Sequence, residues 1–90
     1  MILVDICRPC GAPWLGGVAC HMISDRSERE LLDFAQGLRI PLAWYQARSP
    51  VPHFDLSPGW RKKAIAAGAR EVDRTGLVEG MRRWRSSNPQ

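Results

Sequence analysis

The sequence is short, weakly basic and globular in composition. Its 90 residues are 44% hydrophobic and 24% charged, the balance of a folded domain rather than a disordered chain. A chain of this length has room for one hydrophobic core, which excludes a two-domain enzyme. The apolar run Met1–Val4 ends at Asp5, and no stretch approaches the roughly 20 apolar residues of a membrane helix. No secretory signal is evident either, so the expected compartment is the cytoplasm.

Positive charge is concentrated in the last third of the chain. The net charge is +4, yet residues 1–59 carry five Arg against six acidic residues, whereas residues 60–90 carry eight Lys or Arg against three. A basic segment attracts phosphate-bearing partners such as nucleic acid or a nucleotide. A solvated basic helix that only aids solubility explains the same charge, so both interpretations stand.

The three cysteines, Cys7, Cys10 and Cys20, form an odd set, which favours a reducing compartment over a disulfide scaffold. Cys7 and Cys10 followed by the Cys20-His21 pair resemble a zinc-ligand pattern. Two adjacent side chains rarely converge on one metal, however. We therefore expect neither a disulfide nor a structural zinc.

The first 23 residues predict two strands joined by a loop. The apolar run at residues 1–4 is typical of a buried strand, and Asp5 lies at its carboxyl end, where ligands bind in open α/β sheets. Residues 7–17 are rich in Pro and Gly and predict a long loop, in which Trp14 is either a lid residue or a packing anchor. Residues 18–23 predict a second short strand.

The middle of the chain predicts a helix and two more strands. Ser27 and Glu30 have the spacing of a capping box, and the apolar residues that follow predict an amphipathic helix over residues 28–38. Residues 42–46 predict a strand because they contain two large aromatic side chains. Residues 53–56 alternate in polarity and predict a short strand with its two polar side chains on one face.

The last third predicts two helices. Ser57 followed by proline is a helix start, and that helix should end near Ala67. Residues 70–72 predict an edge strand. Thr75 can cap a final helix, and residues 86–90 should be frayed. We therefore predict a compact α/β domain over residues 1–74, with a three- to five-stranded mixed sheet and two or three helices, and a basic C-terminal helix and tail over residues 75–90.

Two short segments carry the candidate chemistry: His21 with Asp25, and His53 with Asp55. Each places an imidazole near a carboxylate, just before a predicted helix. An imidazole transfers protons near neutral pH or binds a metal, and a carboxylate can orient it or hold a divalent ion. We expect these four side chains to line one concave surface, with Asp5 near its floor.

Three further residues complete the predicted site. Arg61, in the first turn of a predicted helix, is expected to hold a phosphate in bidentate fashion, and Trp44 and Gln46 are expected to line the pocket. Structural alternatives exist for two of the polar residues. His53 is also compatible with a strand residue satisfied by a backbone carbonyl, and Asp25 with a helix-entry residue; for either residue taken alone, the structural interpretation is favoured.

These residues, taken together, resemble the small bacterial and phage domain of unknown function family 4031. The resemblance spans about residues 2–72 and is carried by Val4-Asp5, His21-Met22 with Asp25, Trp44-Tyr45-Gln46, His53-Phe54-Asp55-Leu56-Ser57, Arg61 and Gly68-Ala69. This chain has Phe54, Ser57 and Trp60 where the family pattern has Tyr, Thr and Lys, and the missing Lys weakens a double-cation phosphate clamp. The resemblance implies that the polar positions form one site, and it brings no activity with it.

The favoured interpretation is an enzyme-like domain acting on a phosphate-containing substrate, nucleic acid or nucleotide, by hydrolysis that a divalent metal ion would assist. In this interpretation His21 and His53 are acid/base groups or metal ligands. The alternative is a non-catalytic module that binds nucleic acid or protein through the arginines of the C-terminal helix, Arg82, Arg83 and Arg85. The apolar side of that helix would pack on the domain or on a second copy of the chain, and no membrane partner is expected.

Overall fold

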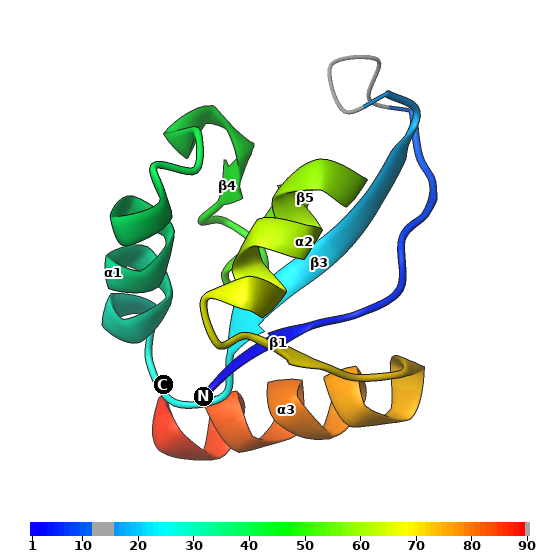
Figure 1. Cartoon of the computed structure of the whole chain (residues 1–90). Helices are drawn as coiled ribbons and strands as arrows, with labels where there is room; N and C mark the ends of the chain where they lie inside the picture. The colour runs from blue at the N-terminus through cyan, green and yellow to red at the C-terminus, as the bar shows by residue number, and fades with distance from the viewer. Residues whose placement is uncertain (12–15, 90) are drawn as a thin grey trace.

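The computed structural model in Figure 1 describes residues 1–11 and 16–89, so that Trp14 lies outside the described residues. It contains a six-stranded mixed sheet and three α-helices, which confirms the predicted class with one strand more than expected. The strands are β1 (Ile2–Val4), β2 (Arg8–Pro9), β3 (Val18–Ser24), β4 (Tyr45–Gln46), β5 (His53–Leu56) and β6 (Arg70–Glu71). The helices are α1 (Glu28–Leu38), α2 (Pro58–Ala66) and α3 (Arg74–Ser87), with a short 3-10 helix, η2 (Leu42–Trp44).

The longest strand, β3, is the centre of the sheet. It pairs antiparallel with β1 on one side and β5 on the other; β4 and β6 close the two edges, and β2 pairs with the start of β3. Among the strand pairs of the described residues, only β1 and β6 run parallel. Directly paired residues point to the same face of a sheet. The register therefore decides which side chains meet.

One face of the sheet is covered by α1 and α2. Val4, Met22 and Phe54 occupy neighbouring positions on β1, β3 and β5, and all three are fully buried. Leu31 of α1 and Ala64 of α2 belong to the same apolar cluster. This face supplies the main core, and both helices are seen beside the sheet in Figure 1.

The opposite face is covered in part by α3. Leu3 and Ile23 are partners across β1 and β3, and they pack with Val51 and with Leu77 of α3. The helix approaches closely at Gly80, where a Cβ atom would lie 2.4 Å from Leu3 Cδ1. The remainder of this face carries polar side chains and forms the candidate site described below. In the described part of the chain, no helix has the length and apolar character needed to cross a membrane.

The prediction of a strand over residues 42–46 was wrong for its first half. The carbonyl of Pro41 accepts a hydrogen bond from the backbone N–H of Trp44, which closes a 3-10 turn, and only Tyr45–Gln46 pair with β5. The predicted loop over residues 7–17 also contains a strand, because Arg8–Pro9 pair with β3.

The helix over 28–38 is confirmed, although its predicted capping box forms only by half. Ser27 Oγ accepts a hydrogen bond from the backbone N–H of Glu30 at 3.1 Å. The Glu30 carboxylate accepts from Ser24 Oγ at 2.6 Å instead of from the N–H of Ser27, which donates to Ser24 Oγ at 3.1 Å. Ser24 therefore joins the end of β3 to the start of α1.

The last helix is longer at both ends than predicted. Asp73 rather than Thr75 caps it, because the Asp73 carboxylate accepts a hydrogen bond from the backbone N–H of Gly76 at 2.8 Å. At the other end α3 continues to Ser87, within the segment expected to fray. The side chain of Asn88 donates to the carbonyls of Trp84 and Arg26, which fixes the end of α3 near the start of α1.

Candidate metal centre

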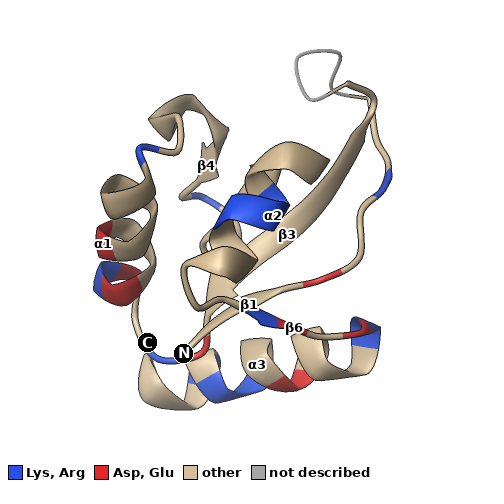
Figure 2. Cartoon of the chain, viewed as in Figure 1, with Lys and Arg blue, Asp and Glu red and all other residues tan. Residues whose placement is uncertain are grey.

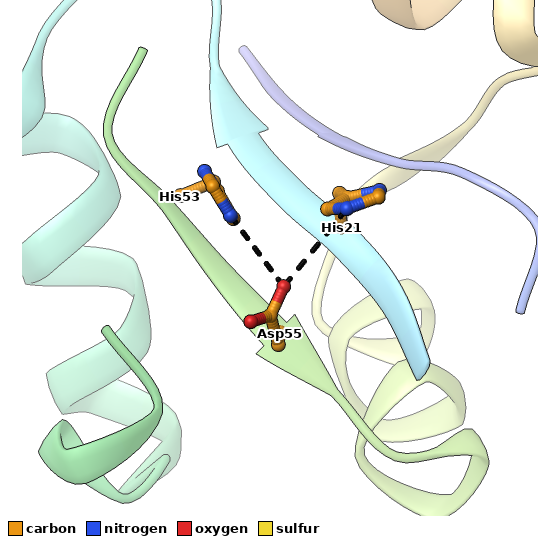
Figure 3. A group of neighbouring side chains, drawn as sticks. All are labelled: His21, His53 and Asp55. Carbon is orange, nitrogen blue, oxygen red and sulfur yellow. Dashed lines mark ion pairs between the residues drawn. The ribbon is translucent and has the colours of Figure 1, made fainter. Parts of the chain in front are cut away.

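Two imidazoles and one carboxylate converge on the partly covered face of the sheet. His21 on β3 lies directly opposite Asp55 on β5, and His53 precedes Asp55 by two residues, so that all three share one face (Figure 3). Asp55 Oδ1 is 3.5 Å from His53 Nε2 and 4.0 Å from His21 Nε2. One ligand atom from each residue can be chosen so that all three lie within 4.8 Å of one another, a separation suited to a single metal ion.

The other ring nitrogen of each histidine is held by an oxygen. His21 Nδ1 lies 3.1 Å from Asp5 Oδ2, and His53 Nδ1 lies 3.1 Å from the carbonyl oxygen of Val51. A carbonyl only accepts hydrogen bonds, so His53 carries its proton on Nδ1 when neutral, and a carboxylate partner favours the same tautomer for His21. Both Nε2 lone pairs are thereby left for a ligand. Metal-binding histidines are held in this way.

Asp5 orients His21 through two contacts. Its carboxylate also accepts a hydrogen bond from the backbone N–H of His21 at 2.6 Å, and the residue is only 7% exposed. The hydrogen bond to Asp5 raises the pKa of His21 above its ordinary value, against the opposing effect of burial. Asp5 therefore fixes the orientation of the His21 ring through these contacts.

Two adjoining cavities open beside these side chains and share Arg8, His21, Ser49 and His53. The larger, about 860 Å³, also contacts Gln46, Arg48 and Asp55. The smaller, about 400 Å³, is bordered by Asp5 and by apolar side chains of the sheet and of α3. The His/Asp group thus lies where the two cavities meet, the larger bordered by more polar residues than the smaller.

Three arginines line these cavities, and the sequence reasoning missed all of them. Arg8 borders both cavities, Arg48 the larger and Arg74 the smaller. None of the three forms an ion pair with any described residue, whereas Arg29, Arg61 and Arg83 do. Arg8 could have been found only by predicting β2, whose pairing with Ala19 on β3 brings Arg8 to the same face as His21.

The family follows from a comparison with family models. The model described as Protein of unknown function (DUF4031) matches residues 2–84 of the chain. The chain belongs to this family. The match extends beyond the resemblance seen over residues 2–72 and includes most of α3. No curated protein and no solved structure matches the chain.

Within this family member, Asp25 does not join the other three predicted site residues. It follows the end of β3, where its carboxylate binds Arg83 Nε of α3 at 3.1 Å and the amino group of Met1 at 2.9 Å. These two hydrogen bonds hold the pKa of Asp25 below its usual range, although burial alone would raise it. Asp25 borders a separate depression with Arg82 and Arg83, and its contacts are structural.

Arg61 and Trp44 also lie apart from the two cavities, whereas Gln46 borders the larger one. Arg61 donates from Nε to the carbonyl oxygen of Asp5 at 2.7 Å and from its terminal nitrogen to Glu71 at 3.1 Å. Its guanidinium therefore joins the end of β1 to β6. Trp44 packs edge-to-face with Trp60, beside the core on the other face of the sheet.

The cysteines contribute no atom to the group of three. Cys20 precedes His21 on β3 and so points to the opposite face, where it is 1% exposed and belongs to the main core. Burial raises the pKa of its thiol, with a further contribution from Cys7, so the thiol is protonated and unsuited to nucleophilic attack. All three cysteines are free.

Proposed function

We propose that this chain is a metal-dependent hydrolase of phosphate esters, with a nucleotide or nucleic acid as substrate. The observation that carries the proposal is the convergence of His21 Nε2, His53 Nε2 and an Asp55 oxygen within 4.8 Å, with both Nδ1 atoms already held by oxygens. Two imidazoles and a carboxylate suit zinc and other first-row divalent ions, and three protein ligands leave a coordination position open.

The chemistry would be a simple hydrolysis. A divalent ion held by His21, His53 and Asp55 would lower the pKa of a bound water toward neutrality and polarise a phosphoryl oxygen. In the hydrolysis, the oxygen of a water molecule would bond to phosphorus as the ester P–O bond breaks. One proton of the water goes to the leaving alcohol and the other stays with the phosphate product. Asp5 keeps His21 in the tautomer that offers Nε2.

Unpaired arginines supply the attraction for phosphate. Arg8 borders both cavities beside His21 and His53, and Arg48 borders the larger cavity with Asp55. A guanidinium binds two phosphate oxygens at once, and no described carboxylate competes for these two. They take the role that the sequence reasoning gave to Arg61.

The free thiols of the chain are consistent with a reducing compartment such as the cytoplasm.

The alternative, a binding module that uses the C-terminal helix, has less support. Figure 2 shows basic residues along α3, but Arg83 is paired with Asp25. Arg82 and Arg85 are exposed and remain available for nucleic acid. The two functions therefore depend on different side chains and separate in one experiment.

The experiment measures hydrolysis of p-nitrophenyl phosphate and bis(p-nitrophenyl) phosphate by metal-stripped protein reloaded with Zn²⁺, Mn²⁺ or Mg²⁺. We expect activity only after reloading, and a loss of about 100-fold or more in His53→Ala and Asp55→Asn. The control for Asp55→Asn is Asp33→Asn, which changes an exposed carboxylate on α1. The Arg82→Gln, Arg85→Gln double variant should keep full activity. Failure of every metal to support hydrolysis of either ester would overturn the proposal.

A further inference from the structure

The smaller cavity has an apolar lining that the hydrolysis itself does not require. Beyond the junction with the His/Asp group, it is formed by two side chains of the sheet region and three of α3: Ile23, Val51, Leu77, Val78 and Met81. Val78 is 43% exposed, so its side chain is accessible to a ligand at this cavity. The volume of the smaller cavity, about 400 Å³, lies within the range of small-molecule binding sites.

Two polar groups stand at the rim of this apolar surface. Arg74, at the start of α3, and Ser49, in the segment before β5, both border the cavity. An arginine can donate to nitrogen or carbonyl acceptors at the edge of a flat ring, and a hydroxyl can donate to or accept from the same edge. An alkyl or acyl chain would use neither group. The lining therefore favours a flat ring with polar edges.

The phosphate position proposed above determines how a ring attached to that phosphate would lie in the smaller cavity. Arg8, His21 and His53 border both cavities, so a phosphate held there has the apolar cavity directly beside it. The positive charges of Arg8 and Arg74 complement a ligand that is anionic at one end and apolar at the other. A nucleotide has this construction.

We propose that the smaller cavity binds the base of a nucleotide, with Met81 and Val78 against the ring and Arg74 at its edge, while the phosphate lies on Arg8 at the His/Asp group. The placing of the phosphate rests on the proposed function; the base site rests on the lining of the cavity. The nucleotide is either a free mononucleotide or the terminal unit of a nucleic acid strand.

Methyl NMR tests the base site without relying on activity. Adenosine 5′-monophosphate, ribose 5-phosphate and butyl phosphate are each titrated into the metal-free protein. We expect the methyl resonances of Val78 and Met81 to shift with the nucleotide alone, and the nucleotide to bind about tenfold more tightly than ribose 5-phosphate because the ring leaves water. A short oligonucleotide in a parallel titration distinguishes a nucleic acid end from a free nucleotide, and binding of either supports the site.

Two matched variants of α3 complete the test. Val78→Lys adds a charge and a long side chain within the cavity, whereas Thr75→Lys adds the same group three residues earlier, at an exposed position that does not border this cavity. The added charge acts on the phosphate of both ligands alike, so the readout is the affinity for the nucleotide relative to that for ribose 5-phosphate. This ratio should fall about tenfold in Val78→Lys and stay unchanged in Thr75→Lys. Equal affinity for nucleotide, ribose 5-phosphate and butyl phosphate would overturn the inference, as would an unchanged ratio in Val78→Lys.

The outcomes also separate the base site from the proposed hydrolysis. Metal-dependent hydrolysis with no preference for a base, and no shift at Val78 or Met81, would overturn the base site and leave the hydrolase. Base-dependent binding without hydrolysis under any metal would overturn the hydrolase and leave a nucleotide-binding site.

Discussion

Asp5 and His21 are joined by two contacts: the Asp5 carboxylate accepts from the His21 backbone N–H at 2.6 Å and lies 3.1 Å from ring Nδ1. The hydrogen bond to the Asp5 carboxylate raises the pKa of His21 above its ordinary value of 6.5. We predict that Asp5→Asn lowers this pKa in the metal-free protein, because the carboxylate charge is lost while the shape is kept. Imidazole NMR titration measures it directly. Titration of His21 at the same pH in both proteins would contradict the assignment.

The same contact predicts how stability varies with pH. Since the pKa of His21 is raised in the folded state, the contact stabilises the fold fully below pH 6.5, and this contribution is lost as the pH rises through the folded pKa. The difference in free energy of unfolding between the native chain and Asp5→Asn should therefore be larger at pH 5.5 than at pH 9. Urea unfolding at both pH values measures it, with Asp33→Asn as a control that should show no such change.

Gly80 is required by the packing of α3 on Leu3. Because Leu3 is only 1% exposed and a Cβ at position 80 would lie 2.4 Å from its Cδ1, Gly80→Ala should destabilise the fold by about 1–3 kcal/mol. Gly37 in α1 has no atom within 4 Å of its own Cβ position. Gly37→Ala should therefore stabilise the protein by about 0.5–1 kcal/mol. Urea unfolding of both variants should give shifts of opposite sign, and equal shifts would refute this packing.

Variants of Arg61 and Arg8 should distinguish an effect on folding stability from an effect on phosphate binding. Arg61→Gln removes the hydrogen bond to the Asp5 carbonyl and the ion pair with Glu71, and should lower the free energy of unfolding by about 1–2 kcal/mol. Arg8→Gln changes an exposed side chain and should leave stability within about 0.5 kcal/mol. Inorganic phosphate followed by ³¹P NMR should bind Arg8→Gln more weakly than the native chain. A phosphate affinity that depends on Arg61 alone would reverse this assignment.

The contacts of Asp25 predict a loss of stability in acid. Because its pKa is lowered in the folded state, the contribution is present above about pH 3.8 and is lost as the pH falls through the folded pKa. Asp25→Asn should therefore cost about 1 kcal/mol at pH 7 and less at pH 2. Thermal unfolding at the two pH values measures the difference. An equal loss at both would show that the carboxylate charge plays no part.

Local signals in the sequence predicted much of the fold. The helix over 28–38 and the strand over 53–56 have the predicted bounds, because caps and periodicity act over a few residues. Alternation along that strand also placed His53 and Asp55 on one face. A 3-10 turn that begins at Pro41 replaces the first part of the strand expected from Leu42. The backbone hydrogen bond of that turn decides the local structure, against the preference of large aromatic side chains for a strand.

The site required contacts that no local signal reports. His21 meets Asp55 through the register of two strands 34 residues apart in the chain, and register depends on the whole buried face. Asp25 looked equivalent to Asp55 in the sequence, yet it pairs with Arg83, 58 residues away, once α3 packs across the end of β3. The basic C-terminal helix, whose apolar side was expected to pack on the domain or on a second copy, is held on the domain by this pair and by Leu77.

Metal binding is the most direct test of the His/Asp group. Zn²⁺ is titrated into the metal-free native chain by calorimetry, with imidazole NMR to identify the coordinating nitrogens. We predict one ion per chain, bound through Nε2 of His21 and His53, and loss of that ion in His53→Ala and Asp55→Asn but not in Asp33→Asn. Absence of Zn²⁺ binding, or an equal affinity in His53→Ala, would contradict the metal centre.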